Sequence, residues 1–366
     1  MSNSFGILLR TTIFGQSHSK AIGVVLDGLP AGEILDFSAI SDFMRRRVPG
    51  QNAHSTARRE ADEPEILSGL ADGRTCGAPL CAVIRNSDTR SSDYSKLKYT
   101  PRPSHSDFCA FVKFHGWNDI SGGGQFSGRL TAPLCFAGAV AKQLLSKHGI
   151  TVGAHILNIA GIYDDAPDTV MASSEELEAI AKKDFPVCND EAGKEMRKAI
   201  ADAKADGDSL GGIIRCYALG LPVGLGEPMF NGMESALSRV VFAIPAVKGL
   251  AFGSGFDCAT MRGSENNDPF YFLDGKVRTK KNDHGGILGG ISTGMPLYFD
   301  VAVKPTPSIA SAQNTVDLLT GNETELKITG RHDPCIVPRA VPCIEAAAAL
   351  TILDHFMIWE KENGTK

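Results

Sequence analysis

The sequence lacks the features that mark nucleic-acid-binding, membrane and secreted proteins. Its 37 lysines and arginines face 42 aspartates and glutamates, giving a net charge of −5, whereas proteins that bind nucleic acid usually carry a basic face. It has no run of about 18 apolar residues, so we expect no membrane span. The N-terminus has no basic segment followed by an apolar stretch, so we expect no signal peptide.

Paired cysteine and histidine motifs are absent as well. The nine cysteines are odd in number and none forms a Cys-x-x-Cys pair. This usage is typical of reduced thiols in a cytoplasmic protein, not of a disulfide framework or a zinc site. The nine histidines show no His-x-x-x-His or Glu-x-x-His spacing, so the sequence predicts no metal centre.

The composition that remains is that of a globular protein rich in glycine. The 366 residues allow one large domain or two smaller ones. No internal repeat or linker divides them, which favours one domain spanning residues 1–366. The 39 glycines cluster at 122–128, 249–255 and 285–294. Clustered glycines indicate backbone that turns sharply or approaches a ligand closely.

Periodicity and capping residues predict a mixture of helices and strands. A helix is expected to start at Asp36 or Ser38, with Asp36 a suitable N-cap, and to end at Arg45–Arg47. Thr131 could cap a second helix that ends at His148 and Gly149. Further helices are expected at 174–184, 189–206, 231–242 and 340–360, and strands at 7–9, 21–26, 151–158, 212–218 and 297–303. The stretch 257–284 shows no clear periodicity, which indicates a lid or partial disorder.

Two polar segments in the N-terminal part could serve a site. The turn Gly15-Gln16-Ser17-His18-Ser19 could present an imidazole to a cleft, or His18 could simply bond a neighbouring carbonyl. The basic segments Arg45-Arg46-Arg47 and Arg58-Arg59 could bind an anion, because guanidinium groups match carboxylates and phosphates. A solvated helix end would explain the same arginines.

Two further segments combine glycine or proline with charge. Gly122-Gly123-Gly124-Gln125-Phe126-Ser127-Gly128-Arg129 runs into a helix, whose N-terminus suits a phosphate, although a plain connection would look similar. It is neither a P-loop nor a dinucleotide-binding fingerprint. The segment 330–335 contains Arg331, His332 and Asp333, which could line a site or form a structural ion pair. Segments 285–292 and 304–308 are rich in glycine or proline and could cradle a ligand.

Together these segments resemble the chorismate synthase family, in the right order and across nearly the whole chain. The resemblance is carried by 14–19, Arg45–Gln51, Arg102–Asp107, 122–131, Ala246–Gly249, Gly285–Ser292, Lys304–Ser308 and Gly330–Ala340. The C-terminal segments are the most specific: Gly-Gly-Ile-Leu-Gly-Gly-Ile-Ser is followed by Gly-Arg-His-Asp-Pro-Cys.

The resemblance implies a fold, a reaction and a cofactor. The implied fold is α+β, a β-α-β sandwich that assembles as a homotetramer. The implied reaction is a 1,4-anti elimination of phosphate from the small anionic substrate 5-enolpyruvylshikimate-3-phosphate, which requires reduced FMN without net oxidation. The sequence leaves open whether the protein reduces its own flavin with NADPH or depends on a separate reductase.

The family's motifs also imply roles for individual residues. The implied acids are His18 and His105, the implied base is Asp333, and Ser17 and Ser127 would support the proton network. The implied flavin-binding residues are Gln125, Phe126, Ser127, Pro245, Ala246, Gly289, Lys304, Pro305, Thr306, Pro307, Ser308 and Arg331. The implied substrate-binding residues are Arg46, Arg129 and Arg339.

Several positions depart from the family's motifs. Gln125 and Phe126 stand in place of Arg and Ser, Leu130 in place of Glu, and Ser104 in place of Gly. These departures favour an alternative, a non-catalytic relative that binds flavin or phosphate, and a purely structural relative is a second one. The presence of both histidines and Asp333 favours a divergent but active enzyme.

Overall fold

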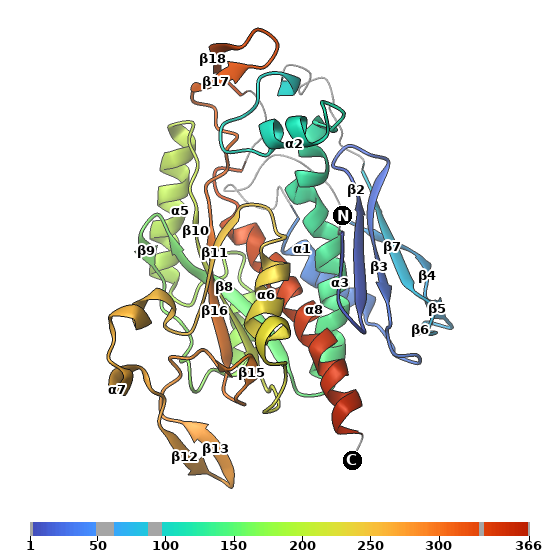
Figure 1. Ribbon diagram of the computed structural model, residues 1–366, viewed down its shortest axis with the longest axis vertical. Coiled ribbons are helices and arrows are strands. Elements are labelled where there is room, and N and C mark those ends of the chain that lie inside the picture. The colour runs from blue at the N-terminus through green and yellow to red at the C-terminus, as the bar shows by residue number, and fades with distance from the viewer. Residues whose placement is uncertain (1–2, 49–61, 87–96, 329–332, 365–366) are drawn as a thin grey trace.

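Two antiparallel sheets lie on either side of two long helices (Figure 1). The computed structural model describes residues 3–48, 62–86, 97–328 and 333–364. The first sheet has the order β1-β2-β3-β7-β4: Ser4–Phe5, Arg10–Gly15, Ala21–Asp27, Leu80–Arg85 and Pro64–Ser68. The second has the order β11-β16-β10-β8-β9: Val247–Phe252, Leu297–Val303, Gly212–Leu219, Thr151–Ile159 and Ile162–Tyr163. This arrangement confirms the predicted α+β sandwich.

Helices α3 (Thr131–Ser146) and α8 (Val337–Asn363) run between the sheets and pack on each other (Figure 1). A Cβ placed on Gly138 would lie 2.2 Å from the Cβ of Ala346, so the two backbones cross too closely for any side chain at position 138. Side chains from both sheets and both helices join one apolar core. The two halves of the molecule are therefore held to each other through this buried layer.

The other helices and short hairpins surround this layer. The helices are α1 (Phe37–Arg45), α2 (Asp107–Lys113), α4 (Ser174–Ala181), α5 (Asp190–Ala205), α6 (Met233–Val241) and α7 (Gly263–Asn266), with short 3-10 turns η2 (Ser121–Phe126), η3 (Gly128–Leu130), η4 (Met229–Asn231) and η5 (Gly255–Thr260). The hairpins pair β5 (Leu70–Ala71) with β6 (Arg74–Thr75), β12 (Phe270–Leu273) with β13 (Lys276–Thr279), β14 (Ile287–Leu288) with β15 (Ile291–Ser292), and β17 (Gln313–Asp317) with β18 (Asn322–Leu326).

Most predicted elements are confirmed. Asp36 caps α1 by accepting the backbone N–H of Ala39 at 3.0 Å, and the strand expected at 297–303 is β16. Two predictions are wrong. Residues 7–9 form no strand and instead connect β1 to β2, which begins at Arg10. The stretch 257–284 is not irregular, because it contains η5, α7 and the β12–β13 hairpin.

One helix, α8, is long and apolar enough to cross a membrane by length and composition alone. An 18-residue window of α8 has a mean hydropathy of 1.5, and 89% of that window is buried inside the fold. A helix that is apolar on every face is typical of a core as well as of a membrane. The burial of α8 between the sheets therefore accounts for its composition.

Candidate active site

The turn that carries His18 lies directly on the glycine-rich segment. It connects β2 to β3, and the backbone N–H of Ser17 donates to the carbonyl of Gly124 at 3.1 Å. The backbone reaches this contact because Gly122, Gly123 and Gly124 all adopt positive φ values of 60°, 85° and 55°, which L-residues with a Cβ rarely adopt. Three consecutive glycines therefore allow the two segments to touch.

Both catalytic histidines of the sequence prediction face this segment. A Cβ on Gly122 would lie 2.8 Å from Nε2 of His18, and one on Gly123 would lie 3.6 Å from Nε2 of His105. Adjacent Cα atoms are about 3.8 Å apart, so the two imidazoles approach neighbouring residues of one loop. The structure thus brings together two side chains that are 87 positions apart in the sequence.

Two predicted serines lie at the same loop. A Cβ on Gly122 would be 2.5 Å from Oγ of Ser17, and one on Gly123 would be 3.7 Å from Cβ of Ser127. Ser17 is 1% exposed, and its hydroxyl has no hydrogen-bond partner within the described part of the chain. A buried hydroxyl without a partner is costly, so this one is suited to meet a ligand.

His105 is held on its other side by a buried ion pair. Its Nδ1 lies 2.6 Å from Oδ1 of Asp107, and Arg102 donates to the same carboxylate from Nε at 2.7 Å and Nη2 at 2.9 Å. Burial alone would raise the pKa of Asp107, but the hydrogen bonds from Arg102 and His105 outweigh it and hold that pKa well below its usual range. The carboxylate is therefore ionised beside the imidazole.

The predicted cofactor segment 304–308 adjoins this group. Arg102 Nη1 donates to Oγ of Ser308 at 3.2 Å, and Nζ of Lys304 donates to the carbonyl of Ser104 at 2.6 Å. The backbone N–H of Lys304 donates to the carbonyl of Ala246 at 2.9 Å. Ala246 has φ of 73°, a strained conformation for a residue with a Cβ. Segments 245–246 and 304–308 therefore lie together on the side of His105.

Arginines and aspartates link the turn of His18 to the C-terminal part of the site. Asp62 is 3% exposed and forms ion pairs with Arg47 and Arg129. Arg129 Nε donates to Oδ1 of Asn86 at 3.0 Å, and Nδ2 of Asn86 donates to the carbonyl of Ser19 at 2.8 Å. Arg129, a predicted substrate-binding residue, is therefore connected to the turn that carries His18.

The same chain of contacts reaches Asp333. Arg339 forms an ion pair with Asp333, and its Nε donates to the carbonyl of Arg47 at 2.9 Å. The predicted base and two predicted substrate-binding arginines therefore share one continuous polar network. Arg331 lies outside the described residues.

Two predicted residues lie elsewhere. Arg46 donates to the fully buried carboxylate of Glu345 at 3.0 and 2.5 Å, and Lys142 pairs with the same carboxylate. Arg46 therefore stands apart from the network of Arg129 and Arg339, and its substrate-binding role stays a prediction. Arg47, the next residue, takes part in the network instead. The carbonyl of Gly290, the residue after Gly289, accepts the backbone N–H of Met233 at the start of α6. Ala246 follows the other end of that helix. Gly289 and Ala246 therefore lie near opposite ends of α6, and the flavin-binding role of Gly289 stays a prediction.

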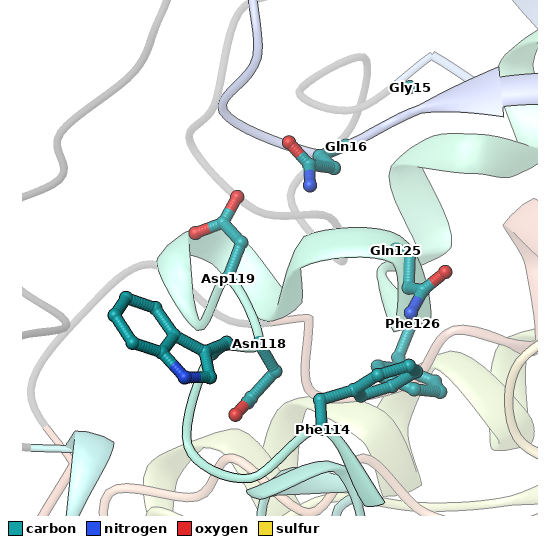
Figure 2. Close-up of a pocket in the computed structure, with 8 residues that line it drawn as sticks. Gly15, Gln16, Phe114, Asn118, Asp119, Gln125 and Phe126 are labelled. Carbon is teal, nitrogen blue, oxygen red and sulfur yellow. The ribbon is translucent and has the colours of Figure 1, made fainter.

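Gln125 and Phe126 line a cleft of about 270 Å³ beside the glycine-rich segment. Figure 2 shows Gln16 and Asp119 pointing into this space from opposite walls. The complete lining is Gly15, Gln16, Phe114, Trp117, Asn118, Asp119, Gln125 and Phe126. The cleft thus combines aromatic rings with amides and one carboxylate.

Sequence reasoning gave no individual role to four side chains that organise the site, Asp62, Asn86, Arg102 and Asp107, and it named Arg47 only as part of a basic segment. Arg102 and Asp107 belong to a quoted motif, and an Arg and an Asp five positions apart could have been tested as a pair. Asp62 carries no such signal, because its partners are 15 and 67 positions away.

One group of side chains among the described residues has the composition of a metal site. His155, Asp164 and Cys188 place their ligand atoms within 4.8 Å of one another. Asp164 also accepts the backbone N–H groups of Cys188 and Asn189 at 2.6 and 2.8 Å, just before α5. These bonds give Asp164 a structural role at the start of that helix.

Two imidazoles lie beside a glycine-rich loop and a buried arginine–aspartate network in an α+β sandwich, and together they form a candidate enzyme site. The family model described as chorismate synthase matches residues 9–357. Chorismate synthases of Korarchaeum cryptofilum and Dehalococcoides mccartyi are 48% and 47% identical to the chain, and each alignment covers 96–97% of both proteins.

A solved structure agrees with these sequences. A crystal structure of chorismate synthase superposes with a TM-score of 0.76 at 27% identity, covering 97% of this chain and 93% of that one. The chorismate synthase of Methanosarcina acetivorans is 45% identical over 355 residues. The chain belongs to the chorismate synthase family, and it is a carbon–oxygen lyase acting on a phosphate.

Proposed function

We propose that the chain converts 5-enolpyruvylshikimate-3-phosphate to chorismate and phosphate by a 1,4-anti elimination that requires reduced FMN. In this reaction the carbon–oxygen bond to phosphate breaks, phosphate leaves with the bonding electrons, and a proton leaves the ring. The observation that carries the proposal is the approach of Nε2 of His18 and of His105 to adjacent glycines, with the unpartnered hydroxyl of Ser17 beside them.

The two imidazoles act as proton donors. His105, held through Nδ1 by Asp107, presents Nε2 to the loop and donates toward the departing phosphate, and His18 donates toward the cofactor. General acids of this kind typically contribute about 10²–10⁴-fold to the rate. Ser17 and Ser127 complete the proton network at the same loop.

Asp333 takes the proton that leaves the ring, and Arg339 holds its carboxylate in place. Arg129 and Arg339 supply the positive charge that the carboxylates and phosphate of the substrate require. Arg331, outside the described residues, is proposed to join them.

The residues near Ala246 and Lys304 fit an anionic cofactor. Lys304 supplies a cation, and Oγ1 of Thr306 is buried without a hydrogen-bond partner in the described part of the chain. The strained backbone at Ala246 and the adjacent Pro245, Pro305 and Pro307 give this cradle a fixed shape. FMN, when bound in reduced form, would lend electron density transiently to the substrate ring.

The proposal is tested by an anaerobic assay of phosphate release with reduced FMN and the substrate. Turnover is expected for the unmodified protein, and a fall of about 10²–10⁴-fold for His105→Ala with nearly unchanged substrate affinity. His148→Ala is the matched control, because that ring is 42% exposed and lies at the end of α3. No phosphate release by the unmodified protein would instead support a relative that only binds flavin or phosphate.

We also propose that the protein is a cytoplasmic homotetramer. Several large apolar side chains are exposed, including Phe230 at 92%, Phe256 at 87% and Phe272 at 79%. Exposed apolar surface of this kind is often covered by another subunit. Light scattering coupled to size-exclusion chromatography measures the assembly, and a monomer at micromolar concentration would exclude this part of the proposal.

A further inference from the structure

Asp107 is placed to control which nitrogen of His105 carries a proton. Its Oδ1 lies 2.6 Å from Nδ1, and a carboxylate oxygen can only accept at that distance, so Nδ1 must be the N–H nitrogen. Arg102 Nη2 also lies 3.2 Å from Nδ1, but it donates to Oδ1 of Asp107 at the shorter distance of 2.9 Å. The aspartate contact therefore decides the tautomer.

The carboxylate itself is held rigidly. Arg102 binds it through two side-chain nitrogens, and the backbone N–H of Arg102 donates to Oδ2 at 3.1 Å. The two side chains are only 5% and 7% exposed. A bidentate guanidinium–carboxylate pair fixes orientation as well as charge, so the direction of the imidazole ring is fixed with it.

The remaining nitrogen of the ring faces the site. With Nδ1 turned to Asp107, Nε2 lies toward Gly123, next to the loop that also meets His18 and Ser17. After His105 gives up a proton from Nε2, the ring keeps its Nδ1–H bond to the carboxylate. The ring therefore needs no reorientation between its two protonation states.

We propose that Asp107, clamped by Arg102, is a positioning residue that keeps a proton on Nδ1 of His105 and aims Nε2 at the Gly122–Gly124 loop. The inference rests on the proposed function, because it gives His105 its task as proton donor. Arg102 also donates to Ser308, so the same clamp joins the imidazole to the segment proposed to hold the cofactor.

The first variant is Asp107→Asn, because the amide can donate to Nδ1 and so favours the wrong tautomer. We expect kcat to fall by about 10–100-fold, less than the loss of the acid itself, with KM nearly unchanged. Asp107→Glu, which keeps the charge, should recover part of the rate. Asp42→Asn is the control, because Asp42 forms an exposed ion pair with Arg45.

A double variant separates positioning from charge balance. Asp107→Asn leaves the buried Arg102 without its counter-charge, which is destabilising, whereas Arg102→Gln with Asp107→Asn removes both charges. If Asp107 positions His105, the double variant regains stability but not kcat. Recovery of the unmodified kcat in the double variant would show that Asp107 only neutralises Arg102, and it would overturn the proposal.

Nitrogen-15 NMR of the imidazole reports the tautomer without any turnover. The unmodified protein should show the Nδ1–H form of neutral His105, and Asp107→Asn should shift the signals toward the Nε2–H form. Identical spectra in the two proteins would refute the positioning role even if activity fell. If the unmodified protein released no phosphate, the proposed function would fail, while this measurement would still decide the role of Asp107.

Discussion

Replacing Gly122 with alanine should disable the site while leaving the fold largely intact. The added Cβ would lie 2.5 Å from Oγ of Ser17 and 2.8 Å from Nε2 of His18, whereas ordinary contact begins at 3.4 Å. The hydroxyl must therefore retreat by about 0.9 Å and the imidazole by about 0.6 Å before the atoms fit. Both neighbours are side chains, so they can move, and the movement displaces catalytic groups.

The size of the effect follows from these displacements. A misplacement of about 1 Å can cost about 10²-fold in rate, so we expect kcat of Gly122→Ala to fall by roughly two orders of magnitude. The backbone at φ of 60° adds a strain of about 1–2 kcal/mol to the folded state. Phosphate release under anaerobic conditions measures the first effect, and urea unfolding measures the second.

Two neighbouring glycines provide controls. Gly123→Ala introduces the same backbone strain, but its Cβ would meet His105 at an ordinary 3.6 Å, so it should lose stability and retain most of its rate. A Cβ on Gly128 would meet no atom within 4 Å, and Gly128 has no positive φ. The rate and the stability of Gly128→Ala should therefore both stay unchanged. An unmodified rate in Gly122→Ala would refute the conclusion that this loop supports the catalytic groups.

Three further predictions concern stability. Ser104→Gly should stabilise the fold by about 0.5–1 kcal/mol, because Ser104 has φ of 57°; a lower melting temperature would contradict this. Gly138→Ala should cost about 3 kcal/mol or more, since its Cβ would overlap Ala346, and a melting temperature equal to that of the unmodified protein would refute the close crossing. Burial alone would raise the pKa of Glu345, but Arg46 and Lys142 outweigh it and lower that pKa from 4.5 to about 2. The ionised carboxylate of Glu345 therefore stabilises the fold by about 3 kcal/mol above pH 4.5, and this stabilisation is lost as the pH falls to 2. In urea unfolding, the stability of Glu345→Gln should depend less on acid pH than that of the unmodified protein.

The sequence predicts elements whose signals are local. Helix α1 has its N-cap at Asp36, and β16 alternates over its full length, so both are confirmed within a residue or two. The strand expected at 7–9 fails for a distant reason. The backbone N–H groups of residues 7, 8 and 9 all donate to the carboxylate of Asp354 at 2.8 Å. No local pattern reveals that a side chain of α8 replaces a strand partner.

The site residues also divide into those that a local sequence motif identifies and those whose partners lie far away in the sequence. His18 and His105 stand in short polar motifs, so they can be named as candidates from the sequence. The choice between Arg46 and Arg47 cannot be made that way, because consecutive residues at a helix end point in different directions. Glu345 captures Arg46 and Asp62 captures Arg47, and both partners are fixed only by the packing of distant segments.

The departures from the family motif and the proposed catalytic groups involve different residues of one loop. Gln125 and Phe126 line the cleft with Trp117, whereas Gly122 and Gly123 face the histidines. Substitution at 125 and 126 therefore changes what the cleft can bind, while Gly122 and Gly123 stay unchanged beside His18 and His105. The chain can therefore lack the positive charge of an Arg at position 125 and still keep His18 and His105 as proposed proton donors. A divergent but active member of the family requires this combination.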